Sequence, residues 1–333
     1  MDNKITKSKV SNFFAYEWII LIVVVLASVL VWELVYTMTA VRLTTGQHFK
    51  YYYDESVYSI NINSLYNTLV DEKTFSYDVL DVGVESLTSD YNVLSTRLTV
   101  QEGDAIITDA VPQGEGDIKV KRADGLIDSY RMFSFEDLTD RARNYLFSFM
   151  KDSVKNGRKF SEIANDEFVY QKLDEEKIAQ NFLKRMKKDN RYRKDEAKKQ
   201  GIQAEKQRIQ KLCDEVVFLQ TQLDTHPEYF YRYTMYSQMV NICEEDEKAG
   251  YQELLAQETE KSYGLNAEAL VPASGNSKLK NNDYFRVRNS EYAEKGSKDV
   301  VILIFDFEDY QKDLQFETIS FLNTIIRTFT VAV

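Results

Sequence analysis

The sequence is poor in the residues that most often build catalytic and metal sites. Its 333 residues include two histidines, His48 and His226, and two cysteines, Cys213 and Cys243. With so few imidazoles, acid–base chemistry built on histidine is not expected. Two cysteines cannot form a disulfide framework, and their spacing is not that of a zinc site. The sequence predicts two small buried apolar residues there, with a single disulfide as the alternative.

Recognised catalytic motifs are also missing. The chain has no nucleophile motif, no glycine loop of the phosphate-binding type and no helical pair of histidines. The net charge of -11 argues against general nucleic-acid binding. We therefore expect no enzymatic activity, no cofactor, no bound metal and no nucleic-acid partner.

Both tryptophans of the chain lie in one apolar stretch near the N-terminus. Trp18 through Trp32 carries no charge, and the apolar character resumes after Glu33 and runs to Val41. About 20 such residues cross a hydrocarbon core of roughly 30 Å as a helix. Trp18, Trp32 and Tyr36 stand at its ends, where aromatic rings favour the headgroup zone. Residues 18–41 are therefore predicted to span a lipid bilayer once; a cleaved signal peptide is the alternative.

The orientation of this helix follows from the basic residues that flank it. Lys4, Lys7 and Lys9 precede the helix, whereas Arg42 and Lys50 follow it. Because basic residues near the ends of a span favour the cytoplasm, residues 1–17 are predicted to be a cytoplasmic tail. The rest of the chain would then be an extracytoplasmic domain of a single-pass protein in the cell membrane.

Residues 42–140 have the pattern of an α/β unit. A tyrosine-rich strand over His48 to Tyr58 is followed by a strand at Ser76 to Glu85, a helix at Tyr91 to Val100 and a buried strand at Asp104 to Asp109. The last three predict a parallel βαβ crossover. A turn-rich break at Pro112 to Asp117 and a loop at Arg122 to Tyr130 are expected next.

Residues 141–261 are predicted to be mainly helical. Ile209, Leu212, Val216, Leu219 and Leu223 form an amphipathic stripe that is typical of core packing. The segment Lys184 to Lys199 holds nine basic residues against three acidic ones. Such a segment either attracts a polyanion, such as headgroups or an anionic wall polymer, or forms a solvated helix face with internal ion pairs.

Residues 262–333 are expected to complete the α/β body. A polar loop is predicted at Pro272 to Asn282. The run Val300 to Phe307 is apolar on both faces, which predicts a central strand covered on both sides. Apolar residues at helical spacing over Phe316 to Phe329 then predict a packed helix. The fold class is therefore α/β with a large helical portion.

Polar residues that follow the two buried strands are the candidate ligand contacts. Thr108 and Asp109 end one strand, and Asp306 and Asp309 follow the other. Open α/β sheets bind ligands beyond the carboxyl ends of their parallel strands. The alternative is that these side chains cap helices and turns. The tyrosines Tyr229 to Tyr236 suit either ligand stacking or a packed interface at a helix start.

Three segments resemble an extracytoplasmic solute-binding protein of the type that serves ABC importers. They are VLSTRLTVQEGDAIITD at 93–109, FEDLTD at 135–140, and KSYGLNAEAL at 261–270 with the strand and helix of 300–326. The second is similar to the point where that family's chain leaves its first lobe, and the third to its Tyr-Gly turn. The layout is similar to reduced, membrane-anchored relatives in Gram-positive bacteria.

This resemblance implies solute capture without catalysis, beside an ABC permease. The chain departs from the family because it keeps its helix, has no tryptophan outside the anchor, and has helices where a second lobe would alternate strands and helices. A second hypothesis is therefore a membrane-anchored structural or interaction protein, whose helical region docks a protein or envelope partner.

Overall fold

The structure is a computed structural model, and it forms two compact units, Met1–Thr44 and Thr45–Val333, which are described separately. Among the residues that the structure describes, the first contains one long helix, and the second, called the body here, contains the strands. The structure describes residues 7, 11, 18–39, 47–54, 62–71, 74–87, 92–100, 102–113, 120–130, 132–162, 172–234, 244–257, 260–270, 299–306 and 316–330.

The long helix is α2, Trp18–Thr39. Its 22 residues rise about 33 Å, which matches the thickness of a hydrocarbon core. Every side chain described in it is exposed, including Trp32 at 73 %. Among the described residues it is the one helix long and apolar enough to cross a membrane, so the predicted anchor is present as a candidate span.

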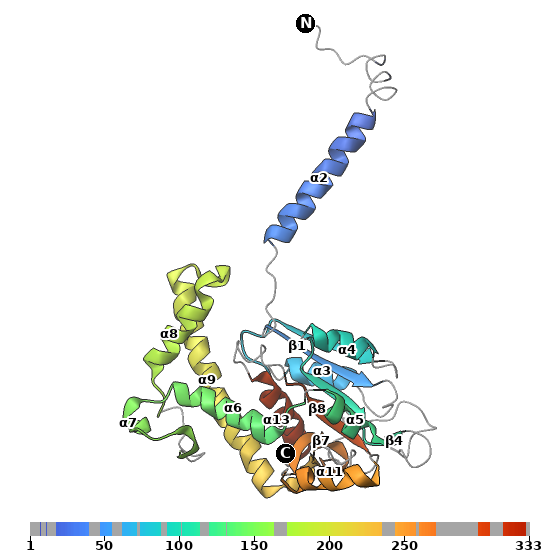
Figure 1. The fold of residues 1–333 in the computed structure, drawn as a ribbon. Helices are drawn as coiled ribbons and strands as arrows, with labels where there is room; N and C mark the ends of the chain where they lie inside the picture. The colour runs from blue at the N-terminus through green and yellow to red at the C-terminus, as the bar shows by residue number, and fades with distance from the viewer. Residues whose placement is uncertain are drawn as a thin grey trace. The chain divides into compact units, whose positions relative to one another are not determined.

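The body is built on a six-stranded mixed sheet with the order β2-β1-β3-β8-β7-β6 (Figure 1). The strands β1, β2 and β3 are parallel, whereas β8, β7 and β6 alternate in direction beyond them. A separate two-stranded ribbon is formed by β4 and β5. The bounds of the strands are β1 His48–Asp54, β2 Asp81–Leu87, β3 Ala105–Asp109, β4 Pro112–Gln113, β5 Val120–Lys121, β6 Phe230–Tyr233, β7 Lys261–Asn266 and β8 Val300–Ile304.

Helices cover both faces of the sheet, as the apolar strand β8 requires. One face packs against α3, α6, α9 and α13, and the other against α4 and α5. The helices of the body are α3 Ile62–Asp71, α4 Asn92–Thr99, α5 Arg122–Ser129, α6 Phe135–Ser148, α7 Asp152–Lys155, α8 Glu175–Arg185, α9 Asp195–Thr225, α11 Glu245–Gln257, α12 Ala267–Leu270 and α13 Glu317–Thr330. Short 3₁₀ turns are η3 Phe160–Glu162, η6 Met186–Lys188, η7 Asn190–Tyr192 and η8 Pro227–Tyr229.

The predicted parallel crossover is confirmed, with one correction to its first strand. The chain runs from β2 through α4 to β3, but it passes over β1, which lies between them. The strand predicted at Ser76 to Glu85 begins only at Asp81. Residues before it turn instead, since Val79 N donates to Ser76 O, and Asp78 is buried against arginines from α8 and η7. The strand predicted at His48 to Tyr58 is β1, and residues 55–58 lie outside the described residues.

The loop predicted at Arg122 to Tyr130 is wrong, because this segment is helix α5. Ala123, Leu126 and Ile127 lie at helical spacing and are all buried against the sheet. The helical spacing of these three residues is hard to recognise in the sequence, because the segment is short and polar and contains Gly125, a residue typical of loops. The predicted break before it contains the short strand β4, and residues 114–119 lie outside the described residues.

Two further predictions are wrong: the segment predicted to start a helix and the segment predicted to form a turn are both strands. Tyr231 and Tyr233 belong to β6, inside the region predicted to be mainly helical. Tyr263 and Gly264 lie within β7, so the Tyr-Gly turn implied by the family resemblance is wrong. A Cβ on Gly264 would come within 2.6 Å of Val301 Cγ1, so close strand packing, not a turn, explains this glycine.

The remaining core predictions are confirmed. The stripe on α9 packs inward, with Ile209, Leu212, Val216 and Leu219 buried and Leu223 partly buried against them. The helix predicted at Phe316 to Phe329 is α13, and the central strand is β8. Cys213 is a buried free thiol, and burial raises its pKa to about 12. Cys243 and the loop predicted at 272–282 lie outside the described residues.

Candidate functional site

The connections of the parallel strands define a topological switch point between β1 and β3. Helix α3, which follows β1, packs on one face of the sheet, whereas α5, which follows β3 and the β4–β5 ribbon, packs on the other. Connections from the two neighbouring strands therefore leave in opposite directions. In open α/β sheets, ligands bind beyond the carboxyl ends of the strands at this kind of position.

Four polar side chains gather at the carboxyl ends of β1 and β3. Asp54 ends β1, Thr108 and Asp109 end β3, and Arg122 begins α5. The Arg122 guanidinium donates to the Asp54 carboxylate and lies with its Nε 4.0 Å from Asp109 Oδ1. We call these four residues the switch-point cluster. The structure thus brings two of the predicted ligand contacts, Thr108 and Asp109, into one cluster with two residues that were not predicted.

Burial gives this cluster a chemical character that a surface ion pair lacks. The side chains of Asp54 and Arg122 are 1 % and 8 % exposed, and that of Asp109 is 14 % exposed. Thr108 is fully buried, and its hydroxyl has no hydrogen-bond partner among the described residues. Within the four described side chains of the cluster, two carboxylates and one guanidinium leave one net negative charge. The cluster can therefore hold a cationic or hydrogen-bonding group in surroundings where electrostatic interactions are strong.

Helix α5 fixes the position of Arg122. Its apolar side packs on the sheet, and its polar side is tied to β6 by two tyrosine hydroxyls. Tyr231 donates to Asp124, and Tyr233 donates to Asp128 at 2.7 Å. Burial is the main cause of the raised pKa of Tyr231, and it also raises the pKa of Asp124. Tyr231 and Tyr233 therefore form a packed contact between β6 and α5. Of the two predicted roles, ligand stacking or a packed interface, this is the second.

The second predicted pair of ligand contacts lies elsewhere. Because β8 is antiparallel to β3, Asp306 follows β8 at the opposite edge of the sheet, beside the start of β3. Its carboxylate accepts two hydrogen bonds from Arg141, at 3.0 and 3.3 Å. Asp309 lies outside the described residues. Asp306 is thus part of an ion pair that joins α6 to the sheet, remote from Thr108 and Asp109.

Of the two cluster residues that the sequence analysis did not predict, Asp54 could have been recognised from the sequence, whereas Arg122 could not. Asp54 directly follows the apolar run of β1, so the rule that selected Asp109 could also have selected it. Arg122 does not directly follow an apolar strand, and its segment was predicted to be a loop, so the same rule could not select it. Its role depends on the pairing of α5 with β3, which no local pattern encodes.

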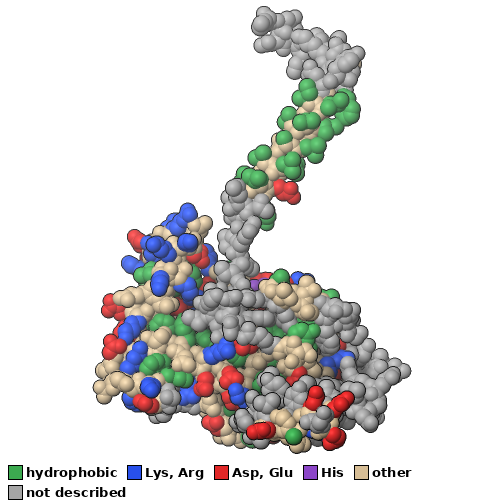
Figure 2. Space-filling model, viewed as in Figure 1, with side chains coloured by type: hydrophobic (Ala, Val, Ile, Leu, Met, Phe, Trp, Pro, Cys, Tyr) green, Lys and Arg blue, Asp and Glu red, His purple; other side chains and the backbone are tan. Residues whose placement is uncertain are grey.

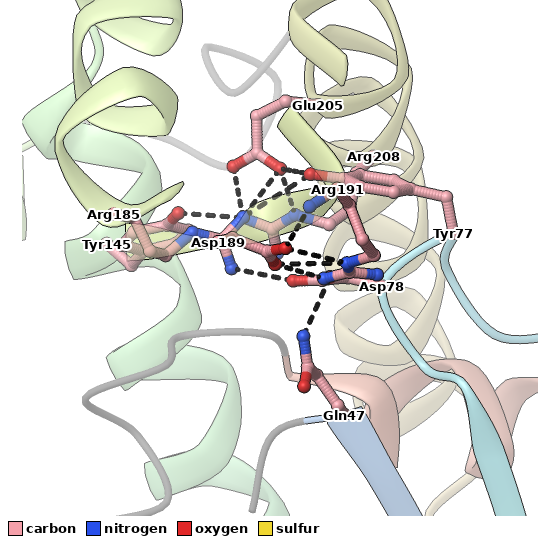
Figure 3. A network of polar contacts seen from close by, with 9 residues as sticks. All are labelled: Gln47, Tyr77, Asp78, Tyr145, Arg185, Asp189, Arg191, Glu205 and Arg208. Atoms are coloured by element: carbon pink, nitrogen blue, oxygen red, sulfur yellow. Dashed lines mark hydrogen bonds and ion pairs between the residues drawn. The ribbon is translucent and has the colours of Figure 1, made fainter. Parts of the chain in front are cut away.

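A second polar cluster joins the helices to the sheet at the other edge (Figure 3). Asp78, in the segment before β2, accepts hydrogen bonds from Gln47, Arg185 and Arg191. Glu205 of α9 accepts four hydrogen bonds from three neighbours: one from Tyr77 at 2.8 Å, one from Arg185 at 2.9 Å, and two from Arg208 at 2.9 and 2.8 Å. We call this the arginine network; its other members are Tyr145 and Asp189.

The arginine network is balanced in charge and so is typical of a structural contact. Three carboxylates, Asp78, Asp189 and Glu205, face three guanidiniums. Burial alone would raise the pKa of Glu205, but the charges of Arg208 and Arg185 and their hydrogen bonds outweigh it, so the pKa is lowered. With each charge compensated inside the network, we assign it to docking α8 and α9 on the sheet.

No metal-binding group of three or more His, Cys, Asp or Glu side chains occurs among the described residues. No protein-family model, curated protein or solved structure matches the chain in the comparisons made with known proteins. The likeness to solute-binding proteins therefore still depends on the three sequence segments alone.

Proposed function

We propose that the chain is a single-pass membrane protein whose α/β body lies outside the cytoplasm and binds a small solute without transforming it. One observation carries this proposal, the meeting of Asp54, Thr108, Asp109 and Arg122 at the β1/β3 switch point. The cytoplasmic location of the N-terminus is supported by Lys4, Lys7 and Lys9 ahead of the anchor.

The switch-point cluster favours a solute that carries a positively charged nitrogen. Its two carboxylates exceed its single guanidinium by one charge, and burial strengthens the attraction for a cation. The buried hydroxyl of Thr108 can donate or accept one further hydrogen bond. Free amino acids, polyamines and small peptides present such a group, whereas a neutral sugar does not.

The retained anchor favours delivery of the solute to a membrane partner over free scavenging. Only residues 40–46 separate α2 from the first described residue of the body, Gln47. A permease of an ABC importer is the partner that the family resemblance implies, and this short tether suits that role.

The proposal is tested by thermal unfolding of the full chain in detergent micelles, with amino acids, polyamines, short peptides, sugars and divalent metals as added ligands. A ligand at 100 times its dissociation constant contributes about 2.7 kcal/mol to the free energy of unfolding. We expect an amine-bearing compound to raise the melting temperature of the wild type.

Two matched variants locate the site. Asp109→Asn removes a carboxylate from the switch-point cluster and should abolish the ligand-dependent shift, measured against the variant's own ligand-free melting temperature. Asp306→Asn makes the same change at the opposite edge and should retain the shift. A shift that survives in D109N, or that disappears equally in D306N, contradicts this assignment.

A second candidate function is supported by the architecture of the body. The described residues form one six-stranded sheet and one two-stranded ribbon, so they contain no second α/β lobe. Helices α8 and α9 pack together and present a strongly charged outer surface (Figure 2). A membrane-anchored interaction protein that docks a partner through this helical region is the better account if no compound in the ligand screen raises the melting temperature.

A further inference from the structure

The end of the α8–α9 pair carries an unusual density of exposed positive charge. Of the nine basic residues in 184–199, Arg185 and Arg191 are used in the arginine network, and Lys198 pairs with Asp195 at 3.0 Å. The others are exposed and gather over this end of the body (Figure 2). We call them the basic tip: Lys184, Lys187, Lys188, Arg193, Lys194 and Lys199.

The basic tip is held in a defined shape. The ring of Phe182 packs edge-on against that of Tyr192, with centroids 5.0 Å apart. Both rings lie against Gly201, where a Cβ would come within 2.4 Å of Phe182 and 2.6 Å of Tyr192. The turn between α8 and α9 is therefore packed on α9, and its lysines project from a fixed support.

The basic tip lies at the edge of the sheet where the chain enters the body. Arg191, between Lys188 and Arg193, donates to Asp78 Oδ1 at 2.8 Å, and the same oxygen accepts from Gln47. Gln47 directly precedes β1 and is eight residues after Thr39, the last residue of α2. Eight extended residues span at most about 29 Å. The covalent chain thus keeps this edge of the body within a short reach of the end of the candidate membrane span.

We propose that the basic tip binds anionic phospholipid headgroups of the bilayer that holds α2. The chain as a whole carries a charge of -11, which an anionic surface repels, and the basic tip is a local exception. Attraction between lysines and anionic headgroups decays over a Debye length of about 8 Å at physiological ionic strength, so the basic tip must approach the bilayer closely, and a short tether favours this by raising its effective concentration at the surface. This interaction rests on α2 spanning the bilayer and not on the solute site.

The experiment uses the full chain in nanodiscs made of phosphatidylcholine alone or of phosphatidylcholine with phosphatidylglycerol. Hydrogen–deuterium exchange is followed by mass spectrometry in peptides that cover residues 184–199. We expect exchange there to slow several-fold in the anionic nanodiscs and to return to the neutral-lipid rate at high salt. Equal exchange in the two bilayers overturns the proposal.

Two pairs of exposed lysines separate a local contact from a general charge effect. Lys187→Glu/Lys188→Glu reverses two charges in the basic tip and should abolish the lipid-dependent protection, while Lys187→Gln/Lys188→Gln should reduce it. Lys151→Glu/Lys159→Glu makes the same charge change at two exposed positions that flank α7, outside the basic tip, and should retain the protection. Loss in both reversed pairs, or in neither, overturns the proposal.

Discussion

Glu205 is the residue at which the arginine network converges, and its ionisation couples the fold to pH. It accepts hydrogen bonds from Tyr77, Arg185 and Arg208, and it is fully buried. Because its pKa is lowered in the folded state, it contributes stability above its unfolded pKa of about 4.3. That contribution is lost as the pH falls through the folded pKa.

We expect Glu205→Gln to destabilise the body by about 3–5 kcal/mol at neutral pH, because it leaves Arg208 buried without its counter-charge. The difference between wild type and variant should shrink as the pH falls below the unfolded pKa of about 4.3, because the stabilisation by ionised Glu205 is lost as the pH falls through its lowered folded pKa. Urea unfolding of residues 45–333, followed by far-ultraviolet circular dichroism from pH 7 to pH 3, measures both effects.

The matched control is Glu175→Gln. Glu175 pairs with Lys206 at 2.5 Å, but its side chain is 57 % exposed, so the variant should unfold close to the wild type. Taking the difference from wild type at each pH also removes the contribution of Glu317, whose pKa is raised mainly by burial and which changes stability in the opposite direction. A difference for E205Q that stays constant down to pH 3 would show that its charge is not what stabilises the network.

At the scale of elements, the sequence predicted best where one element carries its own periodic signal. Helix α13, the stripe on α9 and the strand β8 have patterns that require no knowledge of their neighbours. The switch-point cluster was half predicted for the same reason, because Thr108 and Asp109 directly follow an apolar strand. Helix α5 was missed because its polar half is stabilised by β6, more than 100 residues away.

Gly201 offers a test of how the turn between α8 and α9 is packed. A glycine inside a helix costs about 1 kcal/mol relative to alanine, so Gly201→Ala would stabilise α9 if only helix propensity mattered. The contacts of Phe182 and Tyr192 oppose this, because a Cβ would overlap both rings. We expect G201A to lower the free energy of unfolding by about 1–3 kcal/mol, the usual range for overpacking.

Gly250 in α11 is the matched control for this substitution. A Cβ there meets nothing within 4 Å, so Gly250→Ala should raise the stability by about 0.5–1 kcal/mol through helix propensity alone. Both variants can be compared by urea unfolding of residues 45–333. If G201A proved as stable as G250A, the turn between α8 and α9 would not be packed on α9 in the way described above.

At the scale of the whole molecule, sequence reasoning identified the anchor and the α/β class but not the arrangement of the body. The order β2-β1-β3-β8-β7-β6 pairs β3 with β8, which lies some 190 residues later in the chain, and local patterns do not encode such pairings. The family resemblance led to a turn at Tyr263–Gly264, whereas the structure has strand β7 there. From the sequence alone, the basic segment 184–199 could be either a solvated helix face or a polyanion-binding surface. Its position beside Gln47, which the structure gives, is what favours the second alternative.

The two proposed surfaces lie at opposite ends of β1, and this predicts that they act independently. The switch-point cluster is at Asp54, and the basic tip is on the side of Gln47. Seven residues of strand separate them by about 23 Å, nearly three Debye lengths at physiological ionic strength. We therefore expect D109N to leave the lipid-dependent protection of residues 184–199 unchanged, and K187E/K188E to leave the ligand-dependent shift in melting temperature unchanged.

A variant that combines the three substitutions should lose both effects, each by the amount seen in its parent variant, within about 0.5 kcal/mol. Exchange in nanodiscs and thermal unfolding in micelles measure the two effects separately on the same protein. Coupling would appear as a lipid-dependent protection that weakens in D109N. Such a result would mean that β1 and the helices packed on it move between two arrangements, and that the bilayer biases the solute site through them.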